Sequence, residues 1–135
     1  MKKKILLIED EFYISDLYKM LLETAGFEVF LGMDGIEGLK LAENLPDLIL
    51  LDIMLPKMNG MVLLKKLKSN ERLKNIPVVL LTNLGQESII KSAFEMGASG
   101  YLLKARLEPN ELAKQVEFFL NNPMYKMDPN TLVLD

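Results

Sequence analysis

Short apolar runs alternate along the chain with longer segments in which apolar residues recur every three or four positions. The first run, KILLI at residues 4–8, predicts a buried strand, and the segment after it predicts an amphipathic helix that ends at Gly26. The spacing predicts that one face of this helix is buried, comprising Ile14, Leu17, Tyr18, Leu21, Leu22 and Ala25.

The same alternation repeats four more times before about residue 120. Apolar runs predict further strands at 28–31, 48–51, 78–82 and 100–104. Segments of helical period predict further helices at about 35–44, 60–69, 86–96 and 109–120. The last of these helices would bury the face that carries Leu112, Ala113, Val116, Phe119 and Leu120.

Five strand–helix units of this kind predict a parallel sheet with helices on both faces, because strands that are apolar throughout must be covered on both sides. Right-handed crossovers leave few strand orders, and we expect the order 2-1-3-4-5. The predicted fold class is α/β, a flavodoxin-like (βα)5 three-layer sandwich. One domain would cover residues 1–122. Residues 123–135, with two prolines and no helical period, would be a docked tail or the start of a linker.

The composition excludes several classes of chemistry. The 135 residues include no Cys and no His, so disulfides, thiolate or imidazole metal ligands and histidine bases are excluded. A net charge of −3 and the lack of a basic stripe argue against direct binding of nucleic acid. No apolar run is long enough for a signal peptide or a membrane span, so we expect a cytoplasmic protein with no membrane contact.

Polar side chains stand at the carboxyl ends of four predicted strands. In the expected strand order these ends meet at one edge of the sheet, near the point where the winding reverses and where such sheets bind ligands. The residues are Glu9, Asp10 and Glu11 after the first strand, Asp52 after the third, Thr82 at the end of the fourth and Lys104 at the end of the fifth.

Each of these residues also has an ordinary structural role open to it. Asp10 or Glu11 could cap the first helix, and for Glu11 capping is the better account. Thr82 could be a strand residue or a helix N-cap, and Lys104 could be a solvated lysine after a strand. Capping explains only one member of an acidic pair, so the set as a whole favours chemistry.

Glu9, Asp10 and Asp52 held close together would repel one another unless a cation were present. Oxygen ligands of this kind favour a hard divalent ion, and Mg²⁺ is the cofactor we expect. With Thr82 and Lys104 beside them, the residues fit phosphoryl transfer to a carboxylate. Asp52 would attack phosphorus, and Thr82 and Lys104 would each contact a phosphoryl oxygen.

Four motifs in this order resemble the receiver domain of two-component response regulators, over residues 3 to about 121: LLIEDE, PDLILLDIMLPKMNG, PVVLLTN and EMGASGYLLK. The resemblance implies a magnesium site, a phospho-acceptor and a switch. The residues it assigns are Glu9, Asp10, Asp52 and the backbone carbonyl of Met54 for Mg²⁺, Asp52 as acceptor, Lys104 for the phosphate, Thr82 and Tyr101 as the switch, and Pro56 and Gly60 in the loop after the acceptor. For Tyr101, a packed strand aromatic is the ordinary alternative.

The resemblance also implies partners. The phosphodonor would be a histidine on a histidine kinase or a phosphotransfer protein, since this chain has no His. Phosphorylation would shift the face formed by the fourth helix, fifth strand and fifth helix, which would bind an unknown downstream protein. No turnover of an external substrate is expected. An aspartate-nucleophile phosphatase is excluded because Met54 stands where its second Asp would be. The alternative is a receiver-like binding module that acts without phosphorylation.

Some positions near the site depart from the family pattern. Ala105 follows Lys104 where the family commonly has a cis proline, so this peptide bond is either trans or strained. Asn83 is larger than the usual residue and would narrow access to the acceptor. Met54 and Leu84 cannot orient a hydrolytic water, so we expect slow spontaneous dephosphorylation.

A further departure concerns self-association. Ser99 and Gly100 precede Tyr101, where receivers attached to winged-helix DNA-binding domains often carry paired acidic residues. The salt-bridged dimer of that subfamily is therefore not expected, and we predict a monomer or a weak dimer.

Overall fold

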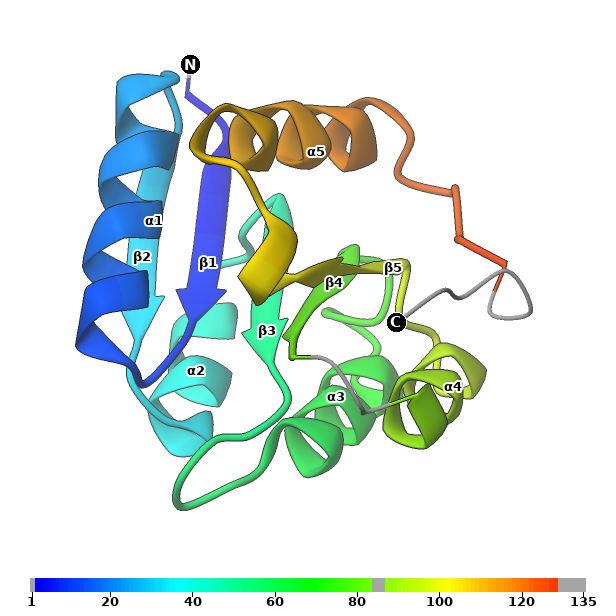
Figure 1. The fold of residues 1–135 in the computed structure, drawn as a ribbon. Helices are drawn as coiled ribbons and strands as arrows, with labels where there is room; N and C mark the ends of the chain where they lie inside the picture. The colour runs from blue at the N-terminus through cyan, green and yellow to red at the C-terminus, as the bar shows by residue number, and fades with distance from the viewer. Residues whose placement is uncertain (1, 84–86, 129–135) are drawn as a thin grey trace.

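The computed structural model describes residues 2–83 and 87–128, which form a three-layer sandwich around one sheet (Figure 1). Neighbouring strands are parallel throughout, and their order is β2-β1-β3-β4-β5. The strands are β1 (Lys4–Ile8), β2 (Glu28–Gly32), β3 (Leu48–Asp52), β4 (Val78–Thr82) and β5 (Gly100–Leu103). The predicted fold class and strand order are therefore confirmed.

Helices cover both faces of the sheet (Figure 1). One face carries α1 (Phe12–Thr24) and α5 (Pro109–Asn121), and the other carries α2 (Gly35–Ala42), α3 (Gly60–Ser69) and α4 (Glu87–Glu95). A short 3₁₀ helix, η1 (Lys104–Arg106), joins β5 to α5. Within the described residues, no helix is both long and apolar enough to cross a bilayer.

Two apolar clusters explain why the strands are apolar along their whole length. Alternate residues of β1 point to opposite layers, so Leu6 and Ile8 pack with α2, α3 and α4, whereas Ile5 and Leu7 pack with α1 and α5. The strands β3 and β4 are buried at every position. A rigid central sheet therefore ends at Asp52 and Thr82.

The predicted buried face of the first helix is wrong at two positions. Leu17 is 41% exposed, and Ala25, which caps the helix C-terminus, is also exposed. The buried stripe is narrower than the apolar pattern and centres on Tyr18 and Leu22, because only that side of α1 reaches the sheet.

Other element bounds differ slightly from the prediction. The helix α2 ends at Ala42, two residues before the predicted end, and β5 ends at Leu103, so that Lys104 belongs to η1. The predicted start of the fourth helix near residue 86, and the position of Leu84, lie outside the described residues.

The first part of the predicted tail, residues 123–128, lies against α5 and β5. Met127 joins the apolar cluster on the α1 and α5 side of the sheet, and Tyr125 packs against Phe118. These residues therefore lie against the sandwich in the described structure.

Candidate functional site

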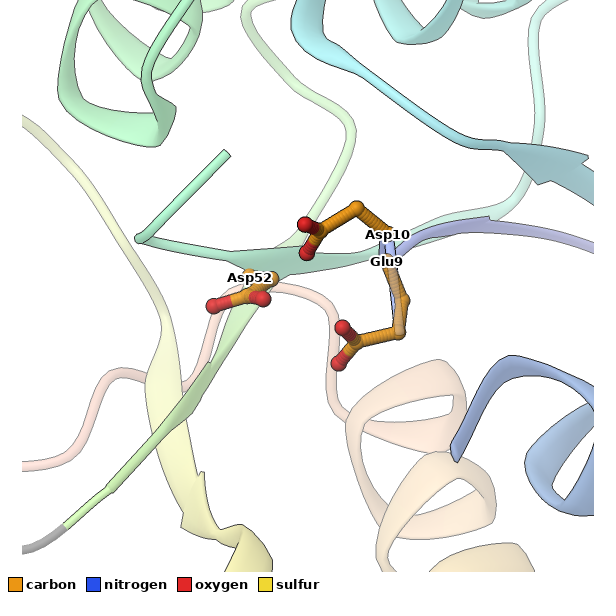
Figure 2. A group of neighbouring side chains, drawn as sticks. All are labelled: Glu9, Asp10 and Asp52. Carbon is orange, nitrogen blue, oxygen red and sulfur yellow. The ribbon is translucent and has the colours of Figure 1, made fainter. Parts of the chain in front are cut away.

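The site lies at the carboxyl ends of β1, β3, β4 and β5. Ile8 pairs with Leu51 in the parallel register, so the residues that follow, Glu9 and Asp52, come side by side. Figure 2 shows the carboxylates of Glu9, Asp10 and Asp52 gathered there, with the consecutive Glu9 and Asp10 side chains leaving the chain in different directions. The structure thus brings together the acidic residues that the sequence predicted for this edge.

Asp52 is held on both of its carboxylate oxygens. Its residue surface is only 4% exposed. The backbone N–H of Met54 donates to Oδ1 at 3.1 Å, and the Lys104 ammonium donates to Oδ2 at 3.0 Å. A short turn after β3 and the lysine that begins η1 therefore fix the orientation of this carboxylate.

Lys104 is the cation of the site rather than a solvated lysine. Its side chain is 4% exposed, and its Nζ lies 2.7 Å from Glu9 Oε1 and 3.0 Å from Asp52 Oδ2. Burial lowers the pKa of Lys104, but the close contacts with the negatively charged Glu9 and Asp52 outweigh burial and raise it above its ordinary value. The amine is thus charged at neutral pH and bridges the two carboxylates.

Glu9 is fully buried, and its electrostatic environment differs from that of a surface carboxylate. Burial, reinforced by the charge of Asp52, raises the pKa of Glu9 to about 7, although Lys104 and a hydrogen bond from the Glu11 backbone lower it. The Glu11 N–H donates to Oε2 at 3.1 Å. No described residue gives Oε1 a hydrogen bond of good geometry, so the nearby Lys104 ammonium acts on it as an ion-pair neighbour only.

The acidic residues fit a divalent cation. Glu9, Asp10 and Asp52 each offer one carboxylate oxygen, and these oxygens lie within 4.8 Å of one another. Mg²⁺ or a similar ion prefers hard oxygen donors of this kind, and it would also coordinate Glu9 Oε1, which accepts no hydrogen bond among the described residues. The Met54 carbonyl as a fourth ligand stays a prediction. The N–H of the same residue donates to Asp52.

Glu11 does not take the role that the sequence favoured for it. It occupies the N-cap position of α1, but its side chain accepts no capping hydrogen bond there. Its carboxylate instead lies 3.6 Å from the Lys104 ammonium. The positive charge at the centre of the site draws this exposed carboxylate away from the helix end, so the capping interpretation is wrong.

The two predicted switch residues lie on neighbouring strands. Thr82 is 1% exposed, and its hydroxyl donates to the carbonyl of Asn83 at 3.2 Å. Tyr101 is half-buried between β5 and α4, with its ring 6.3 Å from that of Phe94. The described residues contain no cis peptide, so the bond between Lys104 and Ala105 is trans.

Gly60 lets the loop after Asp52 fold tightly onto the end of β3. Its N–H donates to the carbonyl of Ile53 at 2.9 Å. A Cβ at this position would lie 2.5 Å from the Asp52 carbonyl oxygen and 2.7 Å from Ile53 Cα, too close for any side chain. Asn59 caps α3 by accepting the Val62 N–H at 3.0 Å, so the helix begins directly at this close approach.

Comparison with known proteins agrees with this fold and shows the family of the chain. The family model described as the response regulator receiver domain matches residues 5–117. The chain belongs to the response regulator receiver family. Its fold is similar to a CheY-like receiver domain protein of Methanospirillum hungatei, with a TM-score of 0.83, 29% identity and coverage of 91% of this chain and 97% of that one. The chemotaxis protein CheY4 of Vibrio cholerae matches with a TM-score of 0.81, 28% identity and coverage of 87% and 98%.

Curated relatives of this receiver domain are regulators of transcription. The DNA-binding dual master transcriptional regulator RpaA of Synechocystis is 47% identical over 102 residues, which are 75% of this chain and 42% of RpaA. The transcriptional regulatory protein CrdR of Helicobacter pylori is 37% identical over 131 residues, which are 96% of this chain and 61% of CrdR. The chain therefore spans about half the length of the curated relatives it matches.

Proposed function

We propose that this receiver domain accepts a phosphoryl group on Asp52 from a histidine of a partner kinase or phosphotransfer protein. The observation that carries the proposal is the double anchoring of the Asp52 carboxylate, by Met54 N–H at 3.1 Å and Lys104 Nζ at 3.0 Å. Both contacts orient a nucleophile at the tip of a buried strand. Membership of the receiver family supports the same role.

The transfer needs no protein base. An oxygen of the Asp52 carboxylate forms a bond to phosphorus as the P–N bond of the donor phosphohistidine breaks. The imidazole nitrogen leaves with the bonding electrons and takes up a proton from solvent. Lys104, which neutralises Asp52 before transfer, would then hold a phosphoryl oxygen, and Thr82 would turn its hydroxyl from the Asn83 carbonyl to the phosphoryl group.

Glu9, Asp10, Asp52 and the Met54 carbonyl would hold the magnesium ion that we propose as cofactor. When bound, the ion supplies positive charge against the phosphoryl oxygens. Glu9 would contribute as a carboxylate whose buried Oε1 lacks a hydrogen bond among the described residues.

The readout would be a population shift on the face formed by α4, β5 and α5. Thr82, drawn toward the phosphoryl group, would leave room for the Tyr101 ring, which lies against Phe94 of α4. A downstream protein would bind this face, in the cytoplasm, with no nucleic acid contact by this chain itself. The relatives named as transcriptional regulators support a role in controlling transcription within a longer protein. We propose that the chain does not turn over an external substrate.

Intact mass spectrometry tests the proposal. The chain is incubated with Mg²⁺ and acetyl phosphate, in parallel with an Asp52→Asn variant. The expected result is a gain of one phosphoryl group that is absent in the variant and absent when EDTA removes the metal. No gain, together with no Mg²⁺-dependent binding of a beryllofluoride mimic, would favour the binding module that acts without phosphorylation.

A further inference from the structure

A segment that follows the last helix lies along the outer side of the edge strand β5. One side of β5 pairs with β4, which leaves backbone groups on the other side without a strand partner. The N–H of Met127 donates to the carbonyl of Ser99 at 2.9 Å, and the N–H of Tyr101 donates to the sulfur of Met127 at 3.4 Å. The segment thus attaches to the sheet edge by one backbone hydrogen bond and one bond to a side-chain sulfur, on the side where an extended peptide can add to a sheet.

Gly100 makes the approach of Met127 possible. A Cβ at residue 100 would lie 2.7 Å from the Met127 sulfur and 2.5 Å from Cζ of Phe119, so any side chain there would push against both. Met is unbranched and polarizable, which suits it to a shallow space over a glycine. Position 100 forms the floor of the contact with Met127. An acidic side chain at this position, directly before Tyr101, would therefore not fit beneath Met127.

An aromatic contact fixes the other end of the segment. The chain turns after α5, where the Tyr125 N–H donates to the Asn122 carbonyl at 3.0 Å. The Tyr125 ring then meets the Phe118 ring edge to face, with centroids 5.0 Å apart, and lies 6.0 Å from the Phe119 ring. The half-exposed ring of Phe118 on α5 is thereby partly covered.

Met127 lies in the middle of a groove between β5 and α5. A hollow of about 250 Å³ on one side is lined by Tyr101, Leu103, Arg106 and Met127 among others. A hollow of about 310 Å³ on the other side is lined by Phe118, Tyr125 and Met127 with Gln115, which borders both hollows. The groove is therefore longer than the contact that the segment now makes.

We propose that the groove between β5 and α5 is a binding site for an extended peptide segment with a methionine over Gly100, and that residues 125–127 of the same chain occupy it. The backbone hydrogen bond from Met127 to Ser99, together with the one from the Tyr101 N–H to the Met127 sulfur, gives the site its direction. The space over Gly100 gives it its preference for an unbranched apolar side chain. A protein partner that uses this groove must first displace Met127. The assignment does not depend on phosphorylation of Asp52.

Amide hydrogen exchange on the full, unphosphorylated chain tests the site. Met127→Ala removes the side chain in the groove, and Met124→Ala is the matched control because Met124 is 90% exposed. We expect the amides of Tyr101 and residue 127 to exchange about fivefold faster in Met127→Ala, the effect of losing most of one partly buried side chain, and to be unchanged in Met124→Ala. Unprotected amides in the wild type, or equal rates in both variants, would overturn the proposal.

A peptide added in trans tests the same site without relying on stability. The probe is a synthetic peptide with the sequence of residues 122–128, NPMYKMD, added to the ¹⁵N-labelled Met127→Ala chain. Binding is expected to shift the amide resonances of Gly100 and Tyr101, and a peptide with Ala at the position of Met127 is expected to cause no such shift. Equal shifts with both peptides, or no shift with either, would contradict the methionine site. If the protection of these amides against hydrogen exchange in the wild type decreases when the protein is diluted, a second copy of the chain occupies the groove. That result would overturn the intramolecular assignment.

Discussion

Replacing Lys104 by Met removes the only cation that contacts both buried carboxylates within the described residues. Its ammonium lies 2.7 Å from Glu9 Oε1 and 3.0 Å from Asp52 Oδ2, and the side chains of these partners are 0% and 5% exposed. Met keeps most of the volume of the Lys stem, so the change is mainly one of charge. The variant leaves two carboxylates facing each other in a site with little access to water.

The cost follows from this burial. Breaking a buried ion pair by removing one partner costs about 3–5 kcal/mol, and we expect about 3 kcal/mol at pH 8 because the carboxylates can relax or protonate. Glu9 already has a pKa raised to about 7 from 4.5, so the folded state binds more protons than the unfolded state between these values, and stability falls as pH rises through that window. Loss of Lys104 raises the pKa of Glu9 further, so the destabilisation is larger at pH 8 than at pH 5.5.

Urea unfolding followed by far-UV circular dichroism, without divalent ions, measures the effect. With a slope of about 1.5 kcal/mol per molar urea, a loss of about 3 kcal/mol lowers the midpoint by about 2 M. Lys57→Met is the control, because Lys57 pairs with Asp34 at 3.4 Å while its own side chain is 65% exposed, and its midpoint should change far less. A Lys104→Met midpoint at pH 8 equal to that of the wild type would refute the electrostatic account of the site.

Three other predictions concern the loop, the lifetime of the phosphoryl group and a lysine of α3. Gly60→Ala should lower the free energy of unfolding by about 1–3 kcal/mol in the same urea assay, since its Cβ meets the Ile53 backbone at 2.7 Å, and an unchanged midpoint would contradict the close approach. Met54→Asn should speed the loss of phosphate from Asp52, measured by intact mass over time. Met54 is 61% exposed, borders an apolar hollow and cannot orient a water molecule, whereas an amide can. An equal lifetime of the phosphoryl group in both proteins would contradict this prediction. Burial, with the charge of Lys126 as a smaller cause, lowers the pKa of Lys68 from 10.5 to about 8. The free energy of unfolding of the wild type should therefore rise with pH between these values, relative to that of Lys68→Gln. Parallel pH profiles of the two proteins would count against this prediction.

The strand ends could be predicted from the sequence because they depend on topology alone. Once five apolar strands are arranged in a parallel sheet, the residues after β1 and β3 must meet, and Glu9 and Asp52 do. The direction of a long side chain depends on more than its place in the sequence. Lys104 was expected to contact phosphate, but its pairing with Glu9 follows from how η1 turns after β5, which no periodic pattern encodes.

The errors have similar physical causes. Helical period gives the direction of a buried face but not its width, so Leu17 was assigned to a stripe that the sheet does not reach. Glu11 has the position of a helix cap, yet its charge responds to Lys104, which is distant in sequence. The contact of Met127 with β5 depends on the space above Gly100 and has no local signal in the sequence.

The central claim is that Asp52 itself carries the phosphoryl group, and its chemical location is the most direct test. Treatment of the phosphorylated chain with borohydride reduces an aspartyl phosphate to homoserine, and peptide mass spectrometry then identifies the modified position. The account predicts homoserine at position 52, formed only after incubation with Mg²⁺ and a phosphodonor. Homoserine at another acidic residue such as Asp10, or none at any position in a chain that has gained a phosphoryl group, would contradict it.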